Sequence, residues 1–108
     1  MFETYSAEEI ADIARSVAEQ RDDILSEKAH AAIIQLVGNI ESTDHTGIKI
    51  LDKLGNGRFA RNIIERAERY RVERLHTANF DHVDNVALLT LTEADVRKAT
   101  EELILSAL

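Results

Sequence analysis

A long segment without glycine or proline most constrains the fold of this chain; it follows Gly57 and continues to about Ala78. Glycine and proline disfavour helix interiors, so their absence allows roughly five or six uninterrupted helical turns here. Apolar residues recur along the segment at helical spacing, which predicts one buried side. These residues are Phe59, Ala60, Ile63, Ile64, Ala67, Tyr70 and Leu75. The segment therefore predicts an amphipathic helix that packs against the rest of the chain.

Glycines flank the expected start of this helix. Gly55 and Gly57 permit backbone angles that a side chain would forbid. Asn56 lies between them and is a favoured N-cap residue, because its side chain can accept a hydrogen bond from a free backbone N–H. We therefore expect the helix to start near Gly57.

The opposite side of the helix is rich in arginine. Arg58 and Arg61 are three positions apart, so they should be neighbours on the first turn. Cations at a helix N-terminus oppose the helix dipole, and an anion bound there would relieve the conflict. The pair therefore indicates a candidate anion site.

The same arginines also fit an ordinary solvated surface. Arg61 with Glu65, Glu65 with Arg69, and Arg69 with Glu73 are opposite charges four residues apart, which stabilise a helix by a few tenths of a kcal/mol each. Surface ion pairs of this kind are common and weak, so spacing alone favours the solvated surface over the anion site.

Two further arginines conflict with the apolar pattern. Arg71 and Arg74 fall within the arc that should be buried. Either their side chains extend along the apolar surface to solvent, or the helix ends or bends near them. Both alternatives remain open from the sequence.

Three other segments predict helices with recognisable starts. Ser6 and Glu9 form a capping box that opens a helix to about Gln20, Ser26 caps a second helix, and Thr92 begins a last one. The expected inner residues are Ile10, Ile13, Ala14, Val17 and Ala18, then Ala29, Ile33, Leu36, Val37 and Ile40, and finally Val96, Ala99, Leu103, Ile104 and Ala107.

These helices predict a small all-α four-helix bundle. Residues 41–54 and 79–85 read as connections, mostly polar, and within the first of them residues 48–51 are either a helical turn or a short extended piece. The apolar segment 86–91 is either helical or a short extended piece. Residues 1–108 make a single domain, since a chain of this length holds one hydrophobic core.

Charge and composition exclude several classes of protein. Residues 55–75 carry 6 basic and 3 acidic side chains, whereas residues 1–54 carry 5 and 11 and residues 76–108 carry 2 and 6. The net charge of −7 argues against a nucleic-acid-binding protein, which needs a broad basic surface. The sequence has no apolar stretch long enough to span a membrane and no basic signal-peptide start, so we expect a cytoplasmic protein without a membrane span.

Motifs for independent chemistry are missing. The sequence lacks cysteine and a GxxxxGK[ST] phosphate loop. Its four histidines show no i, i+4 pair, so we expect no metal site. The serines at helix starts are explained by capping, which leaves no candidate nucleophile among them.

Several motifs in a fixed order resemble the C-terminal lid subdomain of AAA+ ATPases of the CbxX/CfqX family. FETYSAEE at residues 2–9 is similar to the opening of that lid, and LTLTEADV at residues 89–96 to the start of its closing helix. GNGRFARNIIERA at residues 55–67 resembles the sensor 2 segment. The family includes the EccA ATPases of type VII secretion, which this chain resembles more than the red-type Rubisco activases.

The resemblance implies a role for each residue of the arginine pair. Arg58 would be the catalytic sensor 2 arginine that contacts the γ-phosphate of ATP, with Arg61 and Gly57 beside it in the nucleotide-binding surface. Mg²⁺ would be held by a large AAA+ subdomain preceding this one in the same polypeptide. This chain would then be a fragment that binds ATP poorly by itself and does not hydrolyse it, because Walker A and Walker B lie in the large subdomain.

The same resemblance implies partners. The lid would couple nucleotide state to its own motion and to neighbouring subunits of a hexamer that remodels a protein substrate. The alternative is a stand-alone helical protein-interaction module. Nucleic-acid binding through Arg58, Arg61, Arg66 and Arg69 is a third and weaker alternative.

Overall fold

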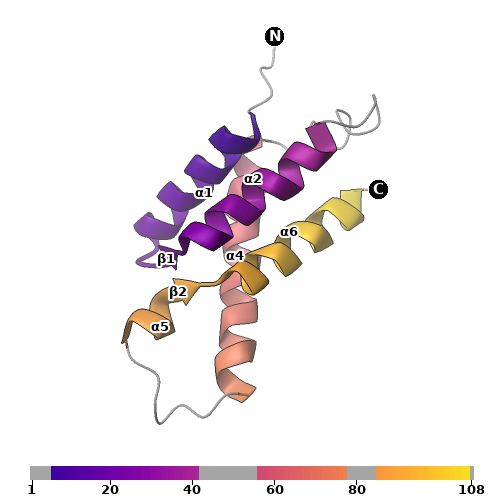
Figure 1. Cartoon of the computed structure of the whole chain (residues 1–108). Helices are drawn as coiled ribbons and strands as arrows, with labels where there is room; N and C mark the ends of the chain where they lie inside the picture. Colours follow the sequence, from indigo (N-terminus) through magenta and orange to yellow (C-terminus); the bar gives the residue numbers. More distant parts are fainter. Residues whose placement is uncertain (1–5, 42–55, 78–84, 108) are drawn as a thin grey trace.

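The computed structural model describes residues 6–41, 56–77 and 85–107. Its elements in chain order are α1 (Ala7–Gln20), β1 (Ile24–Leu25), α2 (Glu27–Glu41), α4 (Asn56–Thr77), α5 (Asn85–Leu89), β2 (Thr90–Leu91) and α6 (Glu93–Ala107). The four long helices α1, α2, α4 and α6 form the bundle shown in Figure 1. The predicted all-α fold is therefore confirmed. No helix in these described ranges combines the length and apolarity needed to cross a membrane.

Helix α1 starts and ends where the sequence predicts. The N–H of Glu9 donates to Ser6 Oγ at 3.1 Å, and the N–H of Ser6 donates to Glu9 Oε1 at 2.9 Å, which completes the capping box. After Gln20, Asp22 adopts a left-handed backbone with φ of 62°. This turn directs the chain from α1 into β1.

Helices α2 and α6 also use the predicted caps. The N–H of Ala29 donates to Ser26 Oγ at 3.1 Å. Thr92 and Asp95 form a reciprocal pair, in which the N–H of Asp95 donates to Thr92 Oγ1 at 3.3 Å and the N–H of Thr92 donates to Asp95 Oδ2 at 3.1 Å. Local hydrogen bonding therefore fixes the first turn of both helices.

A two-stranded parallel sheet joins the two halves of the bundle. Ile24 pairs with Thr90 and Leu25 with Leu91, and the N–H of Ser26 extends the pairing to Leu91 O at 3.3 Å. The extended piece proposed near 86–91 is thus limited to Thr90–Leu91, and helix α5 precedes it. Its partner β1 was not predicted, because two-residue strands have too short a pattern to recognise.

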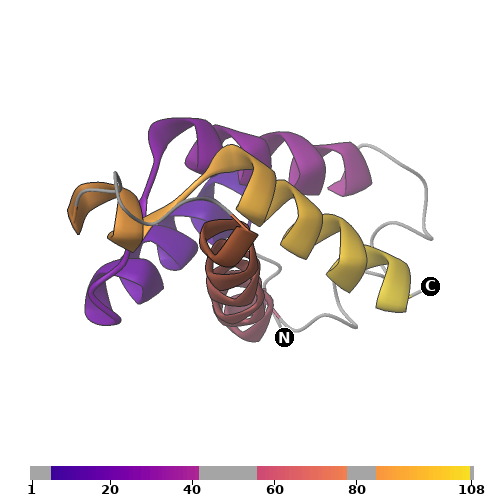
Figure 2. The ribbon, with the colours of Figure 1, turned by 90° about the horizontal axis from the view of Figure 1, so that it is seen from below.

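The hydrophobic core lies where α4 crosses the other helices. Helix α4 runs behind α2 and α6 in Figure 1 and is seen nearly end-on in Figure 2. It packs against α1 and α6, while α2 packs against the same two helices on the other side of the core. The largest side chains buried in the core are Phe59, Ile10, Ile33, Ile63, Ile64, Leu91, Val37 and Val96.

Most of the predicted inner residues are buried, which confirms the helical pattern, whereas Leu36 is only partly buried. Among the described side chains, Ile13, Val17, Ile34, Tyr70 and Ile104 are only partly buried and pack around the edge of the core. The side chains of Ile40 and Ala107 lie outside the described part of the structure, as do residues 42–55 and 78–84.

Candidate functional site

The arginine pair lies at the start of α4, as predicted. Both side chains are exposed to solvent. Arg61 Nε donates to Glu65 Oε1 at 3.2 Å, and these side chains are 66% and 46% exposed. Among the residues that the structure describes, Arg58 has no hydrogen-bonding or ionic partner. One member of the pair therefore has the predicted surface ion pair.

Gly57 lies inside the helix and not in front of it. Helix α4 begins at Asn56, and the φ angle of Gly57 lies outside the left-handed region. The helix thus starts near Gly57, as expected, and Gly57 does not use the left-handed angles that glycine permits. A Cβ placed on Gly57 would meet no atom of the described residues within 4 Å. The missing side chain leaves the backbone beside Arg58 open on this surface.

A shallow depression lies further along α4, next to α6. It has a volume of about 230 Å³ and is lined by Asn62, Glu65, Arg66, Arg69 and Leu103. Arg66 Nη1 donates to Glu102 Oε2 of α6 at 3.2 Å, so this arginine holds the two helices together. Of the two arginines lining the depression, Arg69 is exposed and Arg66 is partly buried.

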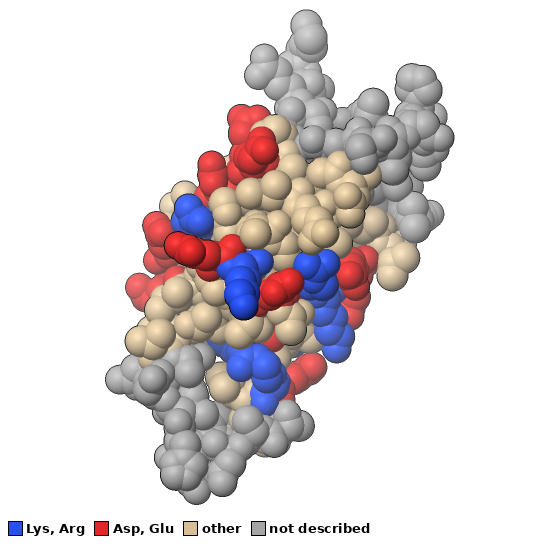
Figure 3. Space-filling model, viewed as in Figure 1, with Lys and Arg blue, Asp and Glu red and all other residues tan. Residues whose placement is uncertain are grey.

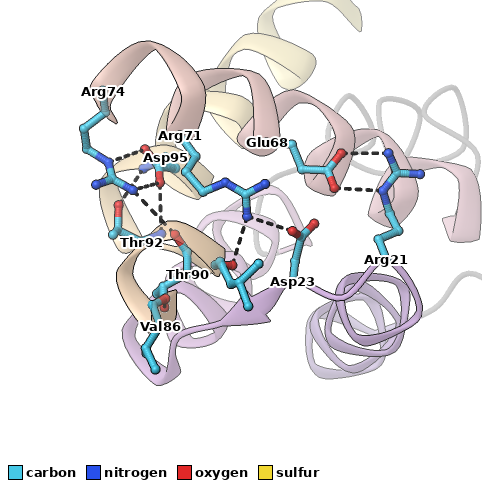
Figure 4. Close-up of polar contacts among 10 residues, drawn as sticks. Arg21, Asp23, Glu68, Arg71, Arg74, Val86, Thr90, Thr92 and Asp95 are labelled. Carbon is cyan, nitrogen blue, oxygen red and sulfur yellow. Dashed lines mark hydrogen bonds and ion pairs between the residues drawn. The ribbon is translucent and has the colours of Figure 1, made fainter. Parts of the chain in front are cut away.

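The sequence left two alternatives open for Arg71, and the structure shows a third. The side chain of Arg71 reaches a buried carboxylate. Its Nη1 donates to Asp23 Oδ1 at 2.7 Å and to the carbonyl oxygen of Leu89 at 2.9 Å. The side chains of Arg71 and Asp23 are only 13% and 4% exposed. Figure 4 shows this arginine extending from α4 toward the turn before β1. These two contacts join α4 to the residues directly before β1 and β2.

Arg74 makes the second contact of this kind. Its Nε and Nη2 donate to the two oxygens of Asp95 at 3.1 and 2.9 Å, and Nη2 also contacts the carbonyl oxygen of Thr90 at 3.5 Å (Figure 4). Asp95 therefore caps α6 and receives a bidentate ion pair with the same carboxylate. No sequence spacing could identify these partners, because Arg74 and Asp95 are 21 residues apart.

A third ion pair adjoins Asp23. Arg21 donates from Nε and Nη2 to the two oxygens of Glu68 at 2.9 and 2.7 Å. Burial, together with the neighbouring carboxyl group of Glu68, raises the pKa of Asp23 above its usual value. Burial also disfavours the charged form of Glu68, but the hydrogen bonds from Arg21 help to outweigh that effect, and the pKa of Glu68 is lowered. The two carboxyl groups thus differ in proton affinity.

Charges of both signs mix over the visible surface. Figure 3 shows acidic side chains over α1 and adjacent basic and acidic side chains across the middle of the molecule. His30 belongs to this mixed surface, since its Nε2 lies 2.9 Å from Asp12 Oδ1. Within the described ranges, no group of three potential ligands among His, Cys, Asp and Glu could hold a metal ion.

Comparison with known proteins found a matching family and several relatives. Residues 6–104 match the AAA lid domain family. The chain is 38% identical over 116 residues to the ESX-3 secretion system protein EccA3 of Mycobacterium leprae, an alignment covering 95% of this chain and 17% of the relative. It is 33% identical over 99 residues to the ESX-1 secretion system protein EccA1 of Mycobacterium tuberculosis, covering 91% and 17%.

A third relative extends the similarity. The ESX-2 secretion system protein EccA2 of Mycobacterium bovis is 34% identical over 99 residues, covering 87% of this chain and 16% of the relative. The chain thus spans less than a fifth of the length of these relatives. No solved structure matches it. The match over residues 6–104, together with the four-helix architecture, shows that the chain belongs to the AAA lid domain family.

Proposed function

We propose that this chain is the C-terminal lid of an EccA-like AAA+ ATPase, and that Arg58 is its sensor 2 arginine. The observation that carries the proposal is an exposed Arg58 on the first turn of α4, without a partner among the described residues. In the proposed complete protein, a large subdomain supplies the Walker motifs and holds Mg²⁺ with ATP. Arg58 then contacts the γ-phosphate at the junction of the two subdomains.

The chemistry of the guanidinium group fits this role. It presents several N–H donors in a plane, which matches two oxygens of a phosphate group. A phosphate at this position also supplies the negative charge that a helix N-terminus favours. Arg58 therefore gains from a phosphate the negative charge that the described residues do not provide.

Arg61 and Gly57 support Arg58 in this proposal. The Arg61–Glu65 pair is exposed, and such pairs contribute about 0–1 kcal/mol, so Arg61 can exchange its carboxylate for a phosphate at little cost. The open space beside Gly57 lets a ligand approach the backbone of the first turn. We assign both residues to the nucleotide-binding surface.

The packing of α4 suggests how the lid responds to nucleotide. Its first turn carries Arg58, and its later turns are fastened by Arg71 and Arg74 to the sheet and to α6. A displacement of the first turn is therefore transmitted to the rest of the bundle. We propose that this motion reaches the neighbouring subunit of a cytoplasmic hexamer that remodels a protein substrate of a type VII secretion system.

A matched pair of variants tests the role of Arg58 in the longer ATPase. Arg58→Ala should lower ATP turnover at least about 100-fold, because it removes a charge-stabilising donor from the transferring phosphate. Arg69→Ala is the control, since Arg69 is also exposed and lies about three turns further on the same side of α4. This control should retain turnover within about twofold, because Arg69 is placed outside the proposed phosphate site.

Circular dichroism and the comparison of ATP turnover together separate the sensor 2 assignment from the interaction module. Far-UV circular dichroism of both variants should match the unchanged protein, since neither arginine is buried. Equal ATP turnover in Arg58→Ala and Arg69→Ala would contradict the sensor 2 assignment and favour a helical interaction module.

A further inference from the structure

The carboxyl group of Asp23 has an unusual environment. Its side chain is only 4% exposed, and Oδ1 accepts a hydrogen bond from Arg71 at 2.7 Å. The other oxygen, Oδ2, is buried and receives no hydrogen bond from any group of the described residues. A buried carboxylate oxygen without a donor is costly, by about 1–3 kcal/mol for a typical polar group. The atom requires a partner.

A second carboxyl group lies beside that of Asp23. Figure 4 shows Glu68 next to Asp23, and each of the two groups shifts the pKa of the other. Both oxygens of Glu68 already accept hydrogen bonds from Arg21. Two ionised carboxylates cannot donate to one another, so a bond between them requires one proton.

The charged groups around Asp23 determine which oxygen carries that proton. Arg71 and Glu68 face it from α4, and Arg21 lies just before it at the end of α1. Segment 85–91, which holds α5 and β2, contains no charged side chain. Glu68 is held ionised by two hydrogen bonds from Arg21, whereas Asp23 Oδ2 has no donor. Asp23 is therefore the group that gains more from the proton.

We propose that Asp23 and Glu68 form a proton-binding site. One proton stays on Asp23 Oδ2, and this O–H group donates a hydrogen bond to a carboxylate oxygen of Glu68. The hydrogen bond tightens the attachment of the turn after α1 to α4. The proton comes from solvent, and the side chain of Glu68, which is 20% exposed, gives it a route. Uptake completes a continuous chain of hydrogen bonds from Arg21 through Glu68 and Asp23 to Arg71. Loss of the proton leaves two like charges side by side.

The sign of the pH dependence follows from the direction of the pKa shift. A raised pKa of Asp23 in the folded state means that protonation stabilises the fold. This contribution is fully present below the pKa of an unfolded aspartate and is lost as pH rises through the raised pKa. An ordinary Asp23–Arg71 ion pair would have a lowered pKa and the opposite dependence.

Asp23→Asn is the direct test, because an asparagine amide imitates the protonated carboxyl group by donating to Glu68 at every pH. Urea unfolding of the full chain is measured for both proteins across the acidic pH range. The equilibrium constant for unfolding of the unchanged protein, divided by that of the variant, should rise with pH and then level off. The rise should be about tenfold for each pH unit by which folding raises the pKa of Asp23. A ratio that falls with pH, or a variant that does not fold, would overturn the proposal.

Glu68→Gln supplies a second readout that does not depend on stability. The titration of the Asp23 carboxyl group is followed by carbon NMR in the unchanged protein and in this variant. Its midpoint should lie above that of an ordinary aspartate, and Glu68→Gln should lower it, because a glutamine amide donates to ionised Asp23 and removes the like charge. A midpoint that Glu68→Gln leaves unchanged contradicts proton sharing.

Discussion

The Arg74–Asp95 pair permits a quantitative prediction, because its two side chains differ sharply in burial. Asp95 is 3% exposed and Arg74 is 37% exposed. Asp95→Ala removes a bidentate charged contact, worth about 1.5–3 kcal/mol, and the cap bond from Thr92, worth about 1 kcal/mol. Without the Asp95 carboxylate, water can hydrate the exposed end of the Arg74 side chain. We therefore expect a loss of about 3 kcal/mol in the free energy of unfolding.

Arg74→Met should cost more, although it removes only one side of the same pair. It leaves the nearly inaccessible carboxylate of Asp95 with the N–H of Thr92 as its remaining donor among the described residues (Figure 4). Removal of one partner from a buried ion pair costs about 3–5 kcal/mol, since the surviving charge cannot regain its hydration. The double variant Arg74→Met with Asp95→Ala should cost less than the sum of the two single changes.

The assay is urea unfolding followed by far-UV circular dichroism, because the chain has no tryptophan to report by fluorescence. Arg97→Met is a matched control, since Arg97 pairs with Glu93 on the surface, where the two side chains are 35% and 45% exposed. This control should change the free energy of unfolding by less than about 1 kcal/mol. Strictly additive costs for Arg74→Met and Asp95→Ala would refute the reasoning from burial.

Two backbone positions give further predictions by the same unfolding assay. Asp22→Gly should raise the free energy of unfolding by up to about 1 kcal/mol, because glycine adopts the observed φ of 62° without the Cβ penalty; a decrease would show that the Asp22 side chain stabilises the turn. Gly57→Ala should raise it by roughly 0.5 kcal/mol, since a Cβ meets no described atom within 4 Å and alanine favours a helix. The latter change should also lower ATP turnover in the longer ATPase if a phosphate approaches Gly57; unchanged turnover would remove Gly57 from the proposed site.

Local sequence patterns predicted most of the fold correctly. Capping residues such as Ser6 and Thr92 act within one helical turn, so their partners lie three positions away and can be read directly. The apolar spacing of α4 likewise identified its buried side, including Phe59 and Ile63. These features are predictable because short-range geometry alone determines them.

The long-range ion pairs of α4 could not be predicted in this way, in contrast to the Arg61–Glu65 pair four residues apart. Arg71 and Arg74 stood out only as charges in an apolar arc, and nothing in the sequence pointed to Asp23 and Asp95 as their partners. The pairs depend on how α4 crosses the sheet and α6, which is set by the packing of the whole core. A conflict between charge and apolar pattern was the available signal that such partners exist.

The arginines of α4 differ in whether they contact a carboxylate of the described residues and in their position along the helix. Arg61, Arg66, Arg71 and Arg74 contact carboxylates of the chain itself. Arg58 and Arg69 are both exposed, but they differ in position along the helix. Arg69 lies in the middle of α4, where the helix dipole has little effect, so hydration suffices for it. Arg58 lies at the N-terminus, where a cation is disfavoured unless an anion joins it. This difference, more than exposure, singles out Arg58 and makes Arg69 its proper control.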